Sequence, residues 1–121
     1  MVIQEFDFPS RVRLKKPIQF KYVFDLPIRS TDRYFTVLAR KNKLNFSRLG
    51  LAIAKKNVKK STDRNKIKRM IRENFRREQH FLGAIDFVVL TRYQTSKATM
   101  KQLEVSLEKH WQNLKNKCSS S

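Results

Sequence analysis

The sequence predicts a small domain of the α+β class, and three observations support this prediction. Apolar residues recur at helical spacing in some segments, and alternate or run together as in strands in others. These segments follow one another in the order helix, strands, helix, strand, helix, with no internal repeat or long linker. A chain of 121 residues suits one domain with a modest core. We therefore expect residues 1–121 to form a single domain, in which a small central sheet packs with about three helices.

The first 16 residues predict an irregular basic arm, because Pro9 breaks regular structure and the stretch after it alternates basic and apolar residues. Pro17 suits the first position of a helix, where its missing N–H costs nothing. Pro27 ends that helix, so it runs to about residue 25. This short helix would carry a stripe of three apolar side chains, Phe20, Val23 and Phe24.

Three segments predict strands. Residues 33–41 (RYFTVLARK) are rich in aromatic and β-branched residues at a period of two, and residues 48–54 (RLGLAIA) alternate cleanly. Residues 42–46 supply the turn between them. The continuous apolar run FVVLT at 87–91 is typical of a central, fully covered strand.

Two longer helices complete the pattern. The first covers about residues 63–79, with N-cap oxygens available before or at its start and an apolar stripe made by Ile67, Met70, Ile71 and Phe75. Thr99 and Gln102 form a capping box that opens the second helix. Residues 116–121 look like a flexible polar tail holding the single cysteine, Cys118.

The net charge of +18, from 28 Lys and Arg against 10 Asp and Glu, points to a polyanionic partner. Self-repulsion of this size destabilises a compact domain unless a polyanion offsets it, and nucleic acid gains counterion release on binding. A well-solvated surface or an anionic membrane are the alternatives. Binding to a membrane is not supported by the sequence, because no basic amphipathic helix stands apart from the core elements. The N-terminus lacks the features of a signal peptide, no apolar run approaches a bilayer span, and a lone cysteine suits a reducing cytosol. We expect a cytoplasmic protein.

The positive charge is concentrated in residues 55–77, which hold eleven Lys and Arg against Asp63 and Glu73, a net +9 and half of the total. On a helical wheel one narrow sector opposite the apolar stripe is almost uniformly cationic, with Lys68 at its border. That sector carries Asn65, Arg69, Arg72 and Arg76. Guanidinium groups can fork onto phosphates, so this face is a candidate RNA-binding surface, the alternative being an ordinary solvated helix.

The strand at 48–54 suggests a second surface. One of its faces is apolar, whereas the other, continued to residue 56, is small in the middle and cationic at both ends: it carries Arg48, Gly50, Ala52, Ala54 and Lys56. Small side chains let a single strand approach the sheet closely. Phe20 and Phe24 could supply a wall on which bases stack. Core packing of the two phenylalanines and a β-bulge at Gly50 are the alternatives.

Two long motifs resemble bacterial ribonuclease P protein subunits. They are RLGLAIAKK at 48–56 and DRNKIKRMIRENFR at 63–76, and the resemblance extends to RVRLKKPIQFKYVF at 11–24 and DFVVLTR at 86–92. The chain departs from the family pattern at Lys66, where an arginine is usual, and by having Leu26 and Pro27 where a glycine is common.

The resemblance implies a non-catalytic protein subunit whose RNA partner removes the 5′ leader of precursor tRNA. Magnesium would be held by that RNA, and the protein would be monomeric in a 1:1 complex, away from membranes. It also implies a left-handed β-α-β crossover around the basic helix. The residues expected to bind the RNA subunit are Lys55, Lys56, Lys59, Lys60, Arg64, Asn65, Lys66, Lys68, Arg69, Arg72 and Arg76. Those expected in a leader-binding cleft are Phe20, Phe24, Arg48, Gly50, Ala52 and Ala54.

The sequence offers no catalytic or metal site of its own. Its acidic residues are scattered, without D-x-D or H-x-E spacing, and His80 and His110 are isolated, as surface or helix-end histidines often are. Two rival functions remain open, a ribosomal protein and a stand-alone nuclease. Precursor-tRNA cleavage by protein alone, RNA alone and both together distinguishes them.

Overall fold

In the part of the chain that the structure describes, the sheet has four strands in the order β1-β2-β4-β3. The computed structural model describes residues 10–119. The strands are β1 (Ile28–Thr31), β2 (Phe35–Lys41), β3 (Arg48–Ala52) and β4 (Ile85–Thr91). β2 is antiparallel to both β1 and β4, whereas β3 pairs in parallel with β4. β4 therefore lies inside the sheet, as its continuous apolar sequence predicted, and β3 forms an edge.

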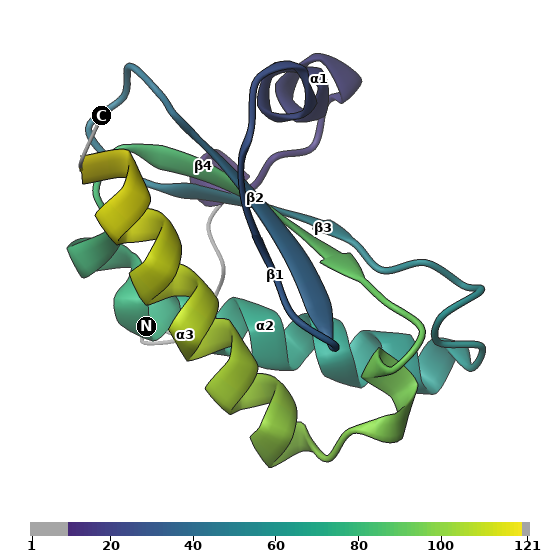
Figure 1. The fold of residues 1–121 in the computed structure, drawn as a ribbon. Coiled ribbons are helices and arrows are strands. Elements are labelled where there is room, and N and C mark those ends of the chain that lie inside the picture. The colour runs from purple at the N-terminus through teal and green to yellow at the C-terminus, as the bar shows by residue number, and fades with distance from the viewer. Residues whose placement is uncertain (1–9, 120–121) are drawn as a thin grey trace, which may run out of the picture.

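Within residues 10–119, three α-helices cover the two faces of the sheet. They are α1 (Pro17–Asp25), α2 (Ser61–Leu82) and α3 (Met100–Ser119), with short 3-10 turns η2 (Ser10–Val12) and η3 (Thr95–Lys97). Figure 1 shows α2 and α3 packed against one face and α1 lying across the other. Since α2 leads from β3 to its parallel neighbour β4, it forms the β-α-β crossover that the resemblance implies. The architecture is α+β, as predicted.

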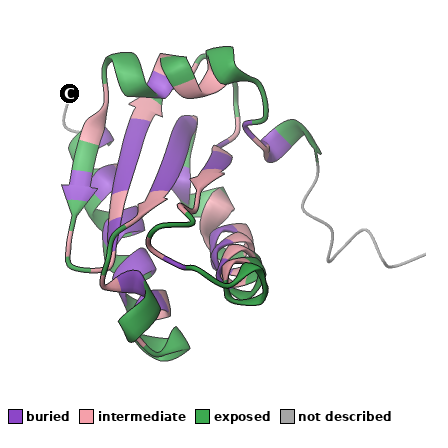
Figure 2. Ribbon diagram, turned by 90° about the vertical axis from the view of Figure 1, so that its right-hand side faces the viewer, coloured by how far each residue is buried: buried purple, intermediate pink, exposed green. Residues whose placement is uncertain are grey.

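The main core lies between the sheet and the α2–α3 layer. Phe75 of α2, Phe87 of β4 and Trp111 of α3 meet edge to face, with ring centroids 5.2–6.1 Å apart. The indole nitrogen of Trp111 donates a hydrogen bond to Oδ1 of buried Asn74 at 2.7 Å, so its one polar atom is satisfied. A smaller core under α1 contains Leu14, Val23, Leu38 and Val88. The two inner strands, β2 and β4, are accordingly mostly buried (Figure 2).

The helix ends of the structure can be compared with the boundaries and caps predicted from the sequence. α1 begins at Pro17 and ends at Asp25 as predicted, and the side-chain oxygen of Gln19 accepts the backbone N–H groups of Lys15 and Lys16. The capping box that opens α3 is confirmed, because Thr99 and Gln102 exchange hydrogen bonds of 2.9 and 3.1 Å. α2 ends at Leu82, and the residue that follows it, Gly83, has a φ of 79°, which favours glycine.

Two predictions are wrong, one at the start of α2 and one at the C-terminal tail. α2 begins at Ser61, after Lys60, without a side-chain cap hydrogen bond. The expected polar tail is helical through Ser119 and buries Cys118 in the main core, because α3 continues its apolar stripe. The described part of the expected irregular arm buries Val12 and Leu14 and forms a parallel bridge between Arg13 and Leu49 of β3. Residues 1–9 and 120–121 lie outside the described residues.

A buried polar cluster joins α3 to the turn between β1 and β2. The carboxylate of Asp32 accepts the backbone N–H groups of Tyr34 and Phe35 at 2.9 Å and the hydroxyl of Ser106 at 2.5 Å. His110, expected near the surface, is instead buried, and its Nε2 lies 3.2 Å from the carboxylate. Burial by itself would raise the pKa of Asp32, but these hydrogen bonds and the nearby histidine hold it below the usual value.

This lowered pKa predicts an acid-sensitive contribution to stability. Since the folded-state pKa of Asp32 is depressed, its contribution is complete above the unfolded pKa of about 4 and is lost as the pH falls through the folded value. We expect Asp32→Asn to lower the free energy of unfolding at pH 6, by an amount that shrinks below pH 4. Urea unfolding of both proteins across this range measures the difference. A difference that stays constant with pH would contradict the assignment.

Candidate nucleic-acid interface

The two faces of β3 separate core from candidate surface as predicted. Leu49 is buried in the main core, and Leu51 and Ile53 pack against it. The alternate residues Arg48, Gly50 and Ala52 therefore point to the α1 side of the sheet. Ala54 follows the end of the strand, which is two residues shorter than predicted.

Gly50 is not exposed on the surface of the strand but is buried where α1 packs against the sheet. A Cβ atom built on Gly50 would lie 2.7 and 2.8 Å from two ring carbons of Phe20 and 3.1 Å from Cβ of Leu14. Only glycine lets the Phe20 ring approach the strand this closely, and there is no bulge, because β3 keeps its register with β4. The small residue thus positions an aromatic ring above the strand.

Phe20 and Phe24 form a continuous aromatic surface on α1. Their ring centroids are 6.5 Å apart with planes inclined by 24°, so the rings are stacked. Phe20 is half-buried, whereas 45% of Phe24 is exposed. Ala52, half-buried, is the next residue after Gly50 on the same face of β3. The structure thus brings Phe20 and Gly50 together and leaves one ring accessible.

Arg48 has a structural partner that the sequence did not reveal. Its guanidinium forms a two-pronged ion pair with the fully buried carboxylate of Asp86 on β4, at 2.9 and 2.6 Å. These hydrogen bonds raise the pKa of Arg48. Asn42 donates a further hydrogen bond of 2.7 Å to the same carboxylate. Arg48 is therefore tied to the sheet, with 19% of its side chain exposed.

The basic surface lies on the loop before α2 and along the outer face of that helix. The apolar stripe of α2 is confirmed, because Ile67, Ile71 and Phe75 are buried and partly buried Met70 packs against the main core. Within the described residues, no side-chain hydrogen bond or ion pair occupies the positive charges of Lys55, Lys56, Lys59, Lys60, Lys66, Lys68, Arg69 and Arg72. Asn65 is exposed on the same helix. This concentration of cations without acidic partners suits phosphate groups.

Two predicted RNA-binding arginines also serve the fold. Arg64 donates to the backbone oxygens of Val58 and Lys59 at 3.0 and 2.8 Å, so it shapes the loop that leads into α2. Arg76 pairs with Glu73 one turn before it at 3.0 Å. Each of these two guanidinium groups has further N–H donors that could bind an RNA phosphate.

Arg13 adds to this surface, although its sequence context predicts only a position in the N-terminal arm. Burial and the nearby positive charge of Arg13 lower the pKa of Arg72. Two cations held close enough to repel each other gain from an anion between them. The alternation of Arg13 with buried Val12 and Leu14 was the available signal, because it predicts an extended segment with its basic residues facing outward.

The described residues contain no group of three or more His, Cys, Asp or Glu side chains that could hold a metal ion. The side chains of residues 10–119 therefore do not fit a magnesium site built from protein ligands alone. None of the described helices is long and apolar enough to cross a membrane.

Comparisons with known proteins identify the family. The family model for ribonuclease P matches residues 8–115. The chain is 46% identical to the ribonuclease P protein component of Methylococcus capsulatus over 98% of this chain and 92% of that protein. It is also 46% identical to the component of Haemophilus influenzae, over 88% of this chain and 89% of that protein.

Solved structures of ribonuclease P proteins have the same fold as this chain. The ribonuclease P protein of Staphylococcus aureus superposes with a TM-score of 0.78 at 34% identity, over 85% of this chain and 94% of that one. The protein from Thermotoga maritima gives 0.75 at 32% identity, over 84% and 96%. Superposition at this level requires the β3–α2–β4 crossover to have the same hand as in those structures, since a mirror-image path would not align. With its sequence, fold and basic helix all in agreement, the chain belongs to the family of bacterial ribonuclease P protein components, a part of the endoribonuclease that processes tRNA.

Proposed function

We propose that this protein binds the catalytic RNA through the basic loop and α2, and holds the 5′ leader of precursor tRNA on the α1–β3 surface. In this proposal the RNA carries the catalytic groups and the magnesium ions, and the protein supplies no catalytic residue. One protein molecule joins one RNA in the cytoplasm, where tRNA precursors are made. The observation that carries the proposal is the row of cations on α2 that have no acidic partner within residues 10–119.

The geometry supports two separate contacts. The basic face belongs to α2 on one side of the sheet, whereas the aromatic pair belongs to α1 on the other side (Figure 1). Exposed Phe24 beside Phe20 offers a stacking surface that accepts any base, as a leader of variable sequence requires. Ala52 leaves room beside this surface.

Reconstitution tests the proposal as a whole. Precursor-tRNA cleavage is measured at low magnesium with the protein alone, the catalytic RNA alone and both together. We expect cleavage to need the RNA and to be faster with both. Cleavage by the protein alone would establish a stand-alone nuclease. An unchanged rate on adding the protein would leave a structural RNA-binding role, as in a ribosomal protein.

Single substitutions on α2 test the RNA-subunit contact. Arg69→Ala and Arg72→Ala should each weaken binding to the catalytic RNA by about 1.5–3 kcal/mol, because each removes a charge-assisted contact to phosphate. Both should remain folded, since neither side chain belongs to the buried stripe. Filter binding or calorimetry gives the affinities. Arg77→Ala is the matched control, an exposed arginine on the same helix outside the predicted set. Equal losses for all three would indicate only a diffuse charge effect.

Substitutions at Ala52 test the leader contact. Ala52→Phe fills the space beside Phe20 without changing charge, and Ala52→Glu adds repulsion toward leader phosphates. Both should weaken holoenzyme binding to precursor tRNA while leaving affinity for mature tRNA nearly unchanged, because mature tRNA has no leader. Ala84→Phe is the control, a half-buried alanine before β4. Overpacking costs about 1–3 kcal/mol of stability, so folding is measured first. Equal losses for precursor and mature tRNA would exclude this surface.

A further inference from the structure

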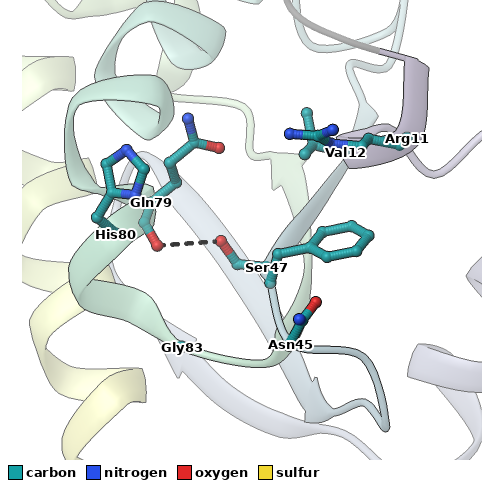
Figure 3. Close-up of a pocket in the computed structure, with 8 residues that line it drawn as sticks. Arg11, Val12, Asn45, Ser47, Gln79, His80 and Gly83 are labelled. Atoms are coloured by element: carbon teal, nitrogen blue, oxygen red, sulfur yellow. Dashed lines mark hydrogen bonds between the residues drawn. The ribbon is translucent and has the colours of Figure 1, made fainter.

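A cavity of about 440 Å³ lies at the C-terminal end of α2, outside both surfaces assigned above. Three segments surround it: η2, the loop between β2 and β3, and the last turn of α2 (Figure 3). Its size falls within the range of small-ligand sites in proteins. Figure 3 shows Gln79 and His80 on the α2 side of the cavity, with Arg11 across from them.

The cavity offers two flat groups to a planar ligand. The guanidinium carbon of Arg11 lies 5.9 Å from the centre of the Phe46 ring, and both residues line the cavity. Phe46 is half-buried because it also packs against the main core, so its position is held by the fold. Aromatic rings and guanidinium planes are the surfaces on which unstacked RNA bases stack. Arg11 also supplies positive charge for a phosphate.

Side-chain amides provide groups that can pair with a base edge. Asn45 and Gln79 both line the cavity. The hydroxyl of Ser47 donates a hydrogen bond to the backbone oxygen of Gln79 at 3.4 Å. The side-chain amide of Gln79 makes no hydrogen bond to any of residues 10–119. An amide both donates and accepts, so it matches the mixed donors and acceptors of a base edge.

The cavity continues the basic face of α2. His80 follows Arg72 and Arg76 at intervals of four residues, so the three side chains lie on one side of the helix, about 6 Å apart along its axis. An RNA strand that follows the arginines therefore reaches the cavity at the next turn. The aromatic leader surface lies on the opposite side of the sheet (Figure 1).

We propose that this cavity binds one unpaired nucleotide of the catalytic RNA, with its base stacked on Phe46 and Arg11 and its edge paired to Gln79. The inference rests on the proposed binding of that RNA by α2, and it adds a position where the protein holds a single base. No pattern in the sequence places Arg11, Phe46, Gln79 or His80 in a site, because these residues come together only when the three segments fold.

Base-specific chemical probing of the assembled complex tests this proposal. Phe46→Leu keeps apolar bulk but removes the aromatic plane, and Gln79→Ala removes the amide without touching the core. We expect one unpaired nucleotide of the catalytic RNA to be protected by the unmodified protein and to become reactive with either variant. The affinity for the RNA should fall about fivefold or more for Phe46→Leu, the loss of one stacked base.

Arg11→Gln and Arg33→Gln form a matched pair. Arg33 is also exposed, and its guanidinium carbon also lies 5.9 Å from an aromatic ring, that of Tyr34, away from the cavity. Both variants lose one charge, so general electrostatics affects them alike. Only Arg11→Gln should expose the protected nucleotide.

Three results would overturn the site. The first is an unchanged probing pattern with folded, fully bound Phe46→Leu and Gln79→Ala. The second is an equal change with Arg33→Gln. The third is a change confined to leader nucleotides when precursor tRNA is added, which would assign the cavity to the other RNA. If Arg69→Ala and Arg72→Ala also leave RNA binding unchanged, the proposed function itself fails, so the two failures are distinguishable.

Discussion

Binding of this protein to the catalytic RNA should weaken by roughly 10³- to 10⁵-fold between 50 and 200 mM salt. This range applies if the basic loop, α2 and Arg13 together contact six to ten phosphates, because each contact releases condensed counterions. The net charge of +18, half of which lies in residues 55–77, supplies enough cations. Affinities measured by filter binding across this range, plotted as log K against log salt, give the number of phosphate contacts from the slope.

Variants of the protein test which residues contribute to the salt dependence of binding. Arg69→Ala should reduce the magnitude of the slope by about one, since it removes one phosphate contact. Asp32→Asn, in the turn between β1 and β2 and not part of the basic face, should leave the slope unchanged at a pH where the variant stays folded. A nearly flat salt response of the unmodified protein would contradict an electrostatic interface and the proposed role of α2.

Arg48→Ala should destabilise the folded protein by about 3–5 kcal/mol. The substitution leaves the carboxylate of Asp86 buried without its cation, and uncompensated buried charge is among the most costly changes in a protein. Urea unfolding monitored by the fluorescence of buried Trp111 gives the free energy. Arg76→Ala is the matched control, because its ion pair with Glu73 is partly exposed and should contribute at most about 1 kcal/mol.

The double variant Arg48→Ala with Asp86→Ala separates charge from packing. Removing both charges should recover much of the loss, because no buried carboxylate is left unpaired. A double variant as unstable as Arg48→Ala would show that the loss arises from packing. If Arg48→Ala were fully stable and instead weakened precursor binding, Arg48 would be a leader contact, as the sequence first indicated.

Local sequence patterns predict most of the helices and strands, but they do not predict β1. The bounds of α1, the start of α3 and the buried stripe of α2 followed from proline positions, a capping box and helical periodicity. β1 was missed because Ile28–Thr31 has only four residues, directly after Pro27, and no apolar alternation. Its strand conformation depends on pairing with β2, which no local pattern reveals.

The sequence predicted the position of the basic face on α2, but it did not predict the contacts that Gly50 and Arg48 make. The basic face of α2 needed only the helical wheel, so it is where the sequence placed it. Gly50 and Arg48 were interpreted as surface groups because their contacts with Phe20 and Asp86 join residues 30 and 38 positions apart. Such contacts depend on how α1 and β4 pack against β3, and alternation along a single strand does not predict them.

The burial of Cys118 makes the chain's single thiol a reporter of local opening. Burial raises the pKa of this thiol, so little of it is the reactive thiolate, and 1% of the residue is exposed. An alkylating reagent can reach it only when the last turn of α3 leaves the core. The labelling rate therefore measures how often that turn opens, on the native protein and without an added probe. Comparing this rate with and without the catalytic RNA would show whether assembly tightens a part of the fold that lies away from α2's basic face.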